Sequence, residues 1–364
     1  MNYRTFVGLD VHKNSIVAYA YCPSSERGMH KRFDYDVKAL ADWLATLEGP
    51  VRTVYESGFC GFSLKRELDA RGIGCVIAAI SKCAKPSGNK VKTDKTDAVF
   101  LAKQLAAGAI TEVRLLDIEL EGMRDLSRMR EQLRDSLTAA KHRVSQAVLR
   151  YGFRYMGEGR NWSDAHRRWL SSLEMPTCYA QAVFDFGLEE VERLEHEKAR
   201  VEKLIREICG QEPLKTAVEA FGLIKGISII TAFCICVETG DFLRFKGARA
   251  FAAYLGLTPS EDTSDTKVSR GPITKTGNKH VRKALIEAAW AQSRAKCPYV
   301  RMPEEAGREI VKAARAINVR LIKRRRHLVG IQKKKPCVAN AAIAREMACS
   351  VFVLAQLCAQ RLAS

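Results

Sequence analysis

The sequence predicts an N-terminal α/β domain followed by a mostly helical region. In residues 4–80, short runs rich in Val, Ile and Tyr alternate with segments of helical spacing. Apolar residues then recur every three or four positions through 118–148 and again through 188–208. Beyond Pro213 the chain alternates apolar helical runs with basic, hydrophilic segments. These three observations favour an α/β plus α architecture.

Five strands and two helices are expected in the first 80 residues. The strands are predicted at Thr5 to Leu9, Ser15 to Cys22, Met29 to Tyr35, Val51 to Tyr55 and Gly74 to Ile80, because β-branched and aromatic residues prefer strands. A helix is predicted from Val37 to Leu47, where Gly49-Pro50 stops it, and another from Phe62 to Ala70. The resulting order, β-β-β-α-β-α-β, is that of a ribonuclease-H-like domain.

A further helix is expected to open within Val91 to Ala98. Asp94 and Asp97 are three residues apart and would share one face, while Leu101 and Leu105 would pack beneath. Acidic residues in a first helical turn are often only favourable partners of the helix dipole, with Thr93 as a possible N-cap. The alternative is that the two carboxylates hold a hard divalent cation.

Two more carboxylates end predicted strands. Asp10 closes the first strand and Glu56 closes the strand after the first helix. In the ribonuclease-H-like order these strands are neighbours, so both carboxylates would emerge at one sheet edge, where the late helix could add Asp94 and Asp97. Four such carboxylates cannot all stay ionised without cations. Two Mg²⁺ ions about 3.5–4 Å apart would neutralise them and clamp a phosphodiester.

A rival with the same first strand is the actin-like or sugar-kinase fold. That fold needs a glycine-rich phosphate loop at the first hairpin. Val11 to Asn14 contains no glycine, so the ribonuclease-H-like prediction is preferred.

The middle of the chain is predicted to form a long antiparallel coiled-coil arm. Its two apolar ladders flank an aromatic and basic insert, Tyr151 to Trp169. The plain role of such an arm is dimerisation or spacing, and the insert could also contact nucleic acid.

The final third contains a turn that looks like a helix-hairpin-helix, Leu223 to Ser228. Backbone N–H groups in such a turn suit phosphate binding, although Lys225 stands where Pro or Gly is usual. A hydrophilic loop is expected from Ser260 to Gly277, and helices are expected at 279–295 and 305–322.

The positive charge of the chain indicates a polyanionic partner. Its 364 residues carry a formal net charge of +19, and nucleic acid is the commonest such partner. Basic runs are often merely solvated, but on this chain backbone-phosphate contact is favoured. The candidate nucleic-acid-binding residues are Lys82, Lys85, Lys90, Lys92, Lys225, Arg270, Lys275, Lys279, Arg282, Lys323, Arg324, Arg325 and Arg326.

Cysteine usage and hydropathy point to a reducing cytoplasm. The 12 cysteines include no Cys-x-x-Cys pair, so Cys234 and Cys236 are interpreted as core thiols rather than zinc ligands. The N-terminal apolar run is broken at Asp10, which is unlike a secretory signal. The apolar stretch from Met347 to Leu357 is too short to span a bilayer, so no membrane partner is expected.

Motifs along nearly the whole chain resemble one known family. They are Gly8 to Lys13, Tyr55 to Gly58, Lys92 to Ala98, Phe251 to Pro259 and Arg270 to Arg282. In this order they resemble the DEDD transposases of the IS110 insertion-sequence family, which include the Piv-type DNA invertases and the bridge-RNA-guided recombinases. Each motif is modest, but their conjunction is highly specific.

The resemblance implies a RuvC-like DEDD catalytic domain at 1–115, the coiled-coil arm at 116–212 and a C-terminal transposase domain at 213–364. Asp10, Glu56, Asp94 and Asp97 would hold magnesium. A serine nucleophile would form a covalent protein–DNA ester. Matching positions places this serine at Ser264, with Ser260 and Ser269 as fallbacks, because Asp265 stands where the family has glycine.

The implied partners are donor and target DNA, a structured guide (bridge) RNA and further copies of the chain, as a dimer or tetramer. Three alternatives stay open. They are a site-specific invertase without guide RNA, a metal-dependent structure-specific nuclease that uses water, and a nucleic-acid-binding protein whose acidic cluster is structural.

Overall fold

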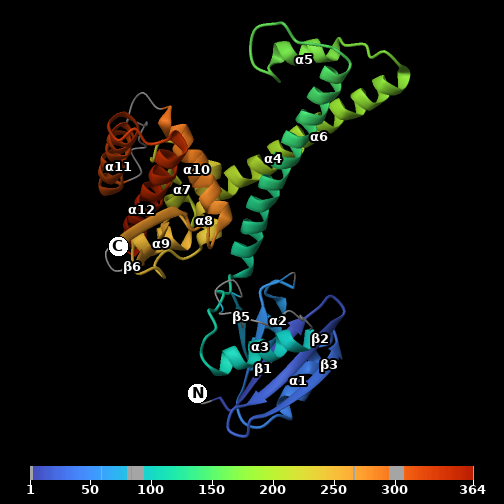
Figure 1. Ribbon diagram of the computed structural model, residues 1–364, viewed down its shortest axis with the longest axis vertical. Coiled ribbons are helices and arrows are strands. Elements are labelled where there is room, and N and C mark those ends of the chain that lie inside the picture. Colours follow the sequence, from blue (N-terminus) through green and yellow to red (C-terminus); the bar gives the residue numbers. More distant parts are fainter. Residues whose placement is uncertain are drawn as a thin grey trace. The chain divides into compact units, whose positions relative to one another are not determined.

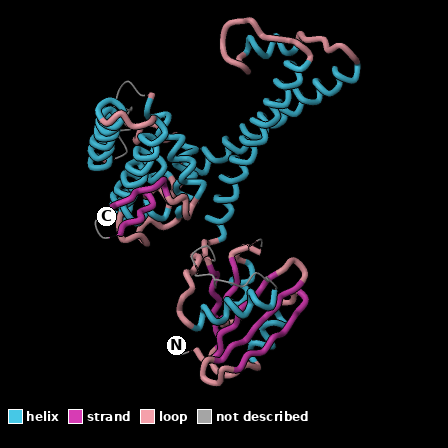
Figure 2. The backbone as a smooth tube through the Cα atoms, viewed as in Figure 1, coloured by secondary structure: helices cyan, strands magenta, loops and turns pink. Residues whose placement is uncertain are grey.

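The computed structural model describes residues 3–58, 60–79, 83, 94–264, 267–294 and 307–363. The chain divides into two compact units, Met1–Leu116 and Asp117–Ser364 (Figure 1). Strands gather in the first unit, whereas the second, over its described residues, consists of helices and one hairpin (Figure 2).

The first unit contains a mixed five-stranded sheet in the order β3-β2-β1-β4-β5. Its strands are β1 (Thr5–Val11), β2 (Ser15–Cys22), β3 (Arg27–Asp34), β4 (Val51–Glu56) and β5 (Gly74–Ala78). The central strand β1 pairs antiparallel with β2 and parallel with β4. The helices are α1 (Val37–Ala45), α2 (Ser63–Ala70) and α3 (Asp94–Ala106). This arrangement confirms the predicted element order and is consistent with a ribonuclease-H-like domain.

The two faces of the sheet are covered by different helices. Buried residues of α1 and α2 form one core with alternate residues of the strands, including Leu9 and Tyr55. On the opposite face, Leu101 and Leu105 of α3 form a second core with Val54. The alternation of side chains along each strand therefore assigns every strand residue to one of these two faces.

Two long helices open the second unit and pack along each other. They are α4 (Ile118–Arg150) and α6 (Cys178–Cys209), with the short α5 (Asp164–Ser171) between them. Their apolar ladders form a shared core, and Arg130 and Glu202 join them at 2.8 Å. Helix α6 starts ten residues before the predicted ladder at Leu188, because Thr177 caps it by accepting a hydrogen bond from the N–H of Ala180.

The rest of the second unit is a helical bundle with one large core. Its helices are α7 (Lys215–Gly222), α8 (Ile229–Thr239), α9 (Ala248–Tyr254), α10 (Lys279–Ser293), α11 (Arg308–Arg326), the π-helix η3 (His327–Ile331) and α12 (Pro336–Ala363). Helix α12 packs against α7, α9, α10 and α11, so it lies at the centre of this bundle.

Helix α12 is longer than its apolar sequence suggested. The expected 11-residue stretch is part of a 28-residue helix that, by length and composition alone, could cross a membrane. Ile343, Met347 and Val351, however, are completely buried in the bundle core. The sequence-based reason, insufficient length, is therefore wrong, but the helix is a core helix.

The segment expected to be a hydrophilic loop contains a hairpin instead. Strands β6 (Pro259–Ser264) and β7 (Lys267–Ile273) pair antiparallel, with a bulge between Pro259 and Glu261. The ribbon is polar and has little apolar alternation, so the usual sequence signal for strands is absent. Backbone pairing forms the ladder without it.

Candidate functional site

Asp10 and Glu56 lie on neighbouring strands at one edge of the sheet. The parallel register pairs Gly8 with Val54 and Leu9 with Tyr55, so the two carboxylates occupy the next position on each strand. Because side chains alternate, Asp10 shares the face of Gly8 and Glu56 shares the face of Val54. Both carboxylates are therefore on the side of the sheet that α3 covers.

Helix α3 approaches this face unusually closely at Gly8. A Cβ atom at position 8 would lie 2.0 Å from the carbonyl oxygen of Ala98 and 2.7 Å from the nitrogen of Ala102. Ala98 and Ala102 are fully buried. A glycine on the strand and two alanines on the helix thus bring the α3 backbone directly onto β1.

The direction of α3 places its first turn toward the carboxylate edge. Phe6, near the start of β1, packs against the core that contains Leu101 and Leu105. Lys103 lies 5.9 Å from the ring centroid of Tyr21, which pairs with Phe6. The later part of α3 therefore covers the beginning of β1, and the helix starts near the strand end that bears Asp10. Asp97 is partly exposed there, and the side chain of Asp94 lies outside the described residues.

His12 is a polar neighbour of this edge that the predicted site lacked. Its Nε2 lies 3.1 Å from Oδ2 of Asp10, whose side chain is 22% exposed. A signal for it was present in the sequence, because His12 is two residues from Asp10 and one residue beyond the end of β1, and side chains two apart along an extended backbone point to the same face. The contact can orient the Asp10 carboxylate.

The donor chemistry of the edge fits a hard divalent cation. Asp10, Glu56 and Asp97 all offer carboxylate oxygens, and α3 opens beside the two strand ends. Among the side chains that the structure describes, no three His, Cys, Asp or Glu residues already form a metal-binding group. The Asp94 side chain, the fourth predicted ligand, is not among them.

The candidate serine lies on the hairpin of the second unit. Ser264 is the last residue of β6 and pairs with Lys267, but its side chain lies outside the described residues. Ser260 donates its hydroxyl to the carbonyl of Pro272 at 3.2 Å, which ties it to the hairpin. Ser269 is exposed and pairs with Asp262.

The predicted helix-hairpin-helix turn joins α7 to α8 and is held by the bundle. The N–H of Lys225 donates to Oδ1 of Asn318 at 2.9 Å, and Nδ2 of the buried Asn318 donates to the Leu223 carbonyl at 2.8 Å. Gly226 has φ 103°, and a Cβ there would lie 2.3 Å from the Ala288 carbonyl oxygen. The Lys225 N–H is thus used inside the protein, so a phosphate contact would fall to its ammonium group.

The basic residues predicted to bind nucleic acid differ in their surroundings. Lys82, Lys85, Lys90 and Lys92 lie outside the described residues, as does the side chain of Arg270 on β7. Lys275, Lys279, Lys323, Arg324 and Arg326 are exposed, and Arg325 is half-buried. Arg282 donates to the carbonyls of Leu255 at 2.8 Å and Thr276 at 2.9 Å, and burial lowers its pKa. Arg282 therefore braces the segments on either side of the hairpin.

Comparison with known proteins decides the family. A model of the IS110-type DEDD transposase domain matches residues 7–153, and a model described as "Transposase IS116/IS110/IS902 family" matches residues 219–303. A protein of Sinorhizobium fredii named "Putative transposase y4qE" is 31% identical, over 96% of this chain and 88% of its own length. The chain belongs to the IS110 family of transposases.

Two further relatives of this IS110-family transposase share less sequence identity with it. The transposase for insertion sequence element IS1533 of Leptospira borgpetersenii is 27% identical over 80% of this chain and 86% of that protein. The insertion element IS110 protein of Streptomyces coelicolor is 23% identical over 79% and 83%. Membership makes the chain an enzyme of DNA cleavage and transfer, and its DEDD domain implies a divalent metal.

Proposed function

We propose that the chain moves an insertion sequence by metal-assisted, serine-based DNA recombination. The observation that carries this proposal is the register of β1 and β4, which sets Asp10 beside Glu56 at the edge where α3 begins with Asp94 and Asp97. Magnesium is the proposed ion, in a two-metal arrangement, because the four proposed ligands are all carboxylates. RuvC-like catalytic chemistry is thereby assigned to residues 1–115.

The chemical step can be written from the residues of the chain. Magnesium, when bound, would neutralise charge at the scissile phosphate. Asp10, Glu56, Asp94 and Asp97 would hold it, and His12 orients Asp10 through their hydrogen bond. The Ser264 oxygen forms a bond to phosphorus and loses its proton, while a bridging P–O bond breaks and the leaving oxygen gains a proton. The protein–DNA ester retains the bond energy, so strands can be resealed without ATP.

The finer assignments are part of the same proposal. Residues 116–212 form the coiled-coil arm, which spaces or dimerises protomers, and 213–364 form the transposase domain that carries Ser264. A structured guide RNA pairs with donor and target DNA, and the protein holds the backbones through basic surface. The active complex is a dimer or tetramer in a prokaryotic cytoplasm. The net charge of +19 supports this combination of nucleic-acid partners.

A covalent-trapping assay tests the proposal. Purified protein with copurifying RNA is mixed with the circular junction of its element, target DNA and Mg²⁺, and the products are separated on a denaturing gel. A protein–DNA adduct that disappears in both Ser264→Ala and Asp94→Asn is expected. Cleaved DNA without an adduct, unaffected by Ser264→Ala, would show a nuclease that uses water. An adduct that persists in Ser264→Ala and vanishes in Ser260→Ala or Ser269→Ala would show that the nucleophile is Ser260 or Ser269 instead.

A further inference from the structure

The positive charge of the chain is concentrated in one short segment. Residues 307–335 contain eleven Lys and Arg against a single acidic residue, Glu309. This segment comprises α11 and η3, beyond both family-model matches. Such a density is unfavourable for folding by self-repulsion, so it calls for an anionic partner.

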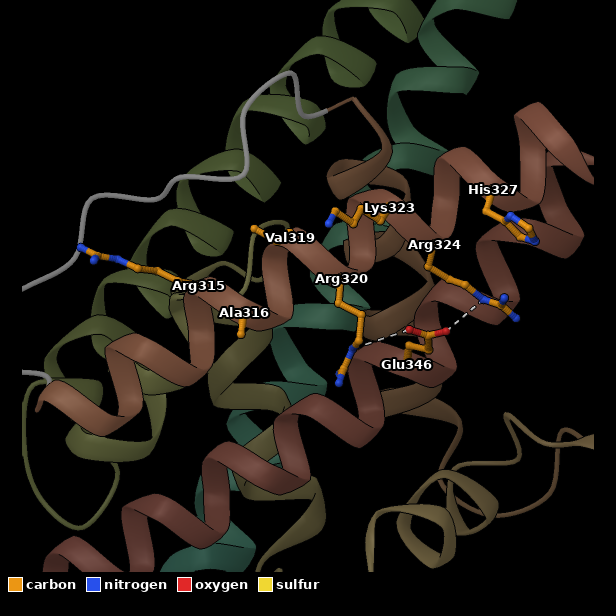
Figure 3. A pocket seen from close by; sticks show the side chains of 8 residues that line it. All are labelled: Arg315, Ala316, Val319, Arg320, Lys323, Arg324, His327 and Glu346. Atoms are coloured by element: carbon orange, nitrogen blue, oxygen red, sulfur yellow. Dashed lines mark ion pairs between the residues drawn. The ribbon is translucent and has the colours of Figure 1, made fainter.

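An open groove of about 970 Å³ follows this segment and part of α12. Figure 3 shows Arg315, Arg320, Lys323, Arg324 and His327 projecting around it, with Glu346 rising from α12 between two of the arginines. Ala316 and Val319 lie among the basic side chains. From residue 315 to residue 327 an α-helix advances about 18 Å. This length covers roughly five nucleotides of one duplex strand at about 3.4 Å each.

The groove has too little negative charge to balance its cations. Glu346 lies 3.2 Å from Nε of Arg324 and 3.9 Å from Nε of Arg320, which also donates to Oγ of Ser350 at 2.9 Å. In the described part of the chain, neither Arg315 nor Lys323 forms an ion pair. One carboxylate therefore faces four cationic side chains.

The basic run at 323–326 is divided between two environments. Lys323 and Arg324 line the groove, whereas the guanidinium of Arg325 lies 5.7 Å from the ring centroid of Trp290 on α10. Arg325 is accordingly half-buried. Only part of the basic run at 323–326 therefore lines the groove, although its four residues look equivalent in the sequence.

We propose that this groove binds the sugar-phosphate backbone of duplex DNA and that Glu346 is a built-in competitor for it. In the free protein Glu346 forms ion pairs with Arg320 and Arg324. Its partners are 57% and 44% exposed, and such exposed ion pairs are weak. Arginine forms bidentate hydrogen bonds with phosphate oxygens, whereas Glu346 lies as far as 3.9 Å from Nε of Arg320, so a phosphate displaces the carboxylate. The inference depends on the proposed function only for DNA being the substrate.

The first test is the salt dependence of DNA binding by the full-length protein. A 30-base-pair duplex is titrated in EDTA at several salt concentrations, so no cleavage contributes. Arg315→Gln combined with Lys323→Gln is expected to reduce the slope of log K against log salt by about 2, since each phosphate contact contributes about 0.9. Arg143→Gln combined with Arg193→Gln removes the same charge from exposed positions on α4 and α6 and should leave the slope near wild type.

The second test removes the competitor. Glu346→Gln is expected to tighten duplex binding about two- to fivefold, which is the range for releasing exposed ion pairs. Glu197→Gln, at a partly exposed α6 residue paired with Arg193, makes the same change in net charge and should have a smaller effect. Equal effects of the two variants, or no effect of Glu346→Gln, would overturn the role of Glu346.

Two further readouts keep the outcomes distinct. If Arg315→Gln with Lys323→Gln weakens binding only to an RNA hairpin and not to the duplex, the groove is not a DNA site. Thermal unfolding of each variant checks that the fold is retained, and a slope change that merely follows unfolding counts against the groove. The covalent-trapping assay requires Mg²⁺ and Ser264, whereas the duplex titration is run in EDTA on protein that keeps Ser264, so a failed covalent-trapping assay and a failed groove proposal are separable.

Discussion

At the residue scale, Gly8 is the position on which the carboxylate edge depends most directly. Gly8→Ala puts a methyl group against the backbone of α3, and overpacking of this kind costs about 1–3 kcal/mol. The helix must move away, which shifts Asp94 and Asp97 relative to Asp10. A misplacement near 1 Å can cost about 100-fold in rate, so metal-dependent DNA cleavage should fall by up to about that factor.

The matched control is Gly122→Ala on α4. A Cβ there meets nothing within 4 Å, so the alanine should stabilise by up to about 1 kcal/mol and leave cleavage unchanged. Thermal unfolding and cleavage rates are compared for the two variants. Wild-type cleavage by Gly8→Ala would mean that α3 does not need its close approach to β1.

Replacement of Arg282 distinguishes a structural role for this residue from the nucleic-acid contact predicted from the sequence. Arg282→Gln leaves the carbonyls of Leu255 and Thr276 without their partner, which should cost about 1–3 kcal/mol of stability. The salt slope of DNA binding should not change. A slope reduced by about 0.9 at unchanged stability would instead identify a phosphate contact.

The positions of Asp10 and Glu56 could be predicted from the sequence, but the contacts that hold the surrounding elements in place could not. Asp10 and Glu56 follow apolar strands, so strand order alone put them at one edge. The close approach at Gly8 depends on Ala98 and Ala102, about 90 residues later in the chain. The Arg282 contacts likewise depend on chain segments that only the tertiary fold brings together.

At the element scale, ion pairs join α4 to its neighbours and should make the second unit sensitive to acid. Burial raises the pKa of Glu131, but hydrogen bonds from His280 and Lys283 outweigh it, so its pKa lies below 4.5. Glu195 and Glu202 have lowered pKa values for the same kind of reason, with Arg167 and Arg130 as partners. A lowered folded pKa contributes stability above about pH 4.5 that is lost as the pH falls through the folded pKa.

Glu131→Gln tests the direction of this pH dependence of stability. Its unfolding temperature should be about 2–4 °C below wild type at pH 7, for a loss of about 1 kcal/mol, and the difference should vanish toward pH 3. Glu192→Gln, at an exposed position of α6, should show no such pH-dependent difference. A difference that grows toward pH 3 would contradict the assignment.

Periodicity accounts for which elements could be predicted. The ladders of α4 and α6 were visible because one apolar face repeats, yet the first turns of α6 expose Tyr179, Val183 and Phe186 and so broke the expected pattern. The hairpin β6–β7 was missed because its side chains are mostly polar. Elements whose sequence does not alternate between core and solvent gave no local signal.

At the scale of the whole molecule, each compact unit has its own hydrophobic core. The strands and α1–α3 supply two clusters within Met1–Leu116, and the remaining helices supply two within Asp117–Ser364. Within the second unit, α4 packs against both α6 and α8, and Arg128 of α4 binds the buried Glu238 of α8 at 2.7 Å. The long helices therefore share stability with the bundle.

Calorimetry of the full chain should then show two unfolding transitions rather than three. Gly8→Ala should lower the transition of the first unit alone, and Glu131→Gln should lower that of the second alone, because changes without shared partners act independently. The double variant should shift both transitions by the same amounts as the single variants. One transition moved by either substitution would show a single cooperative unit. A third transition would mean that α4 and α6 unfold separately from the bundle, as the predicted boundaries at 116–212 imply.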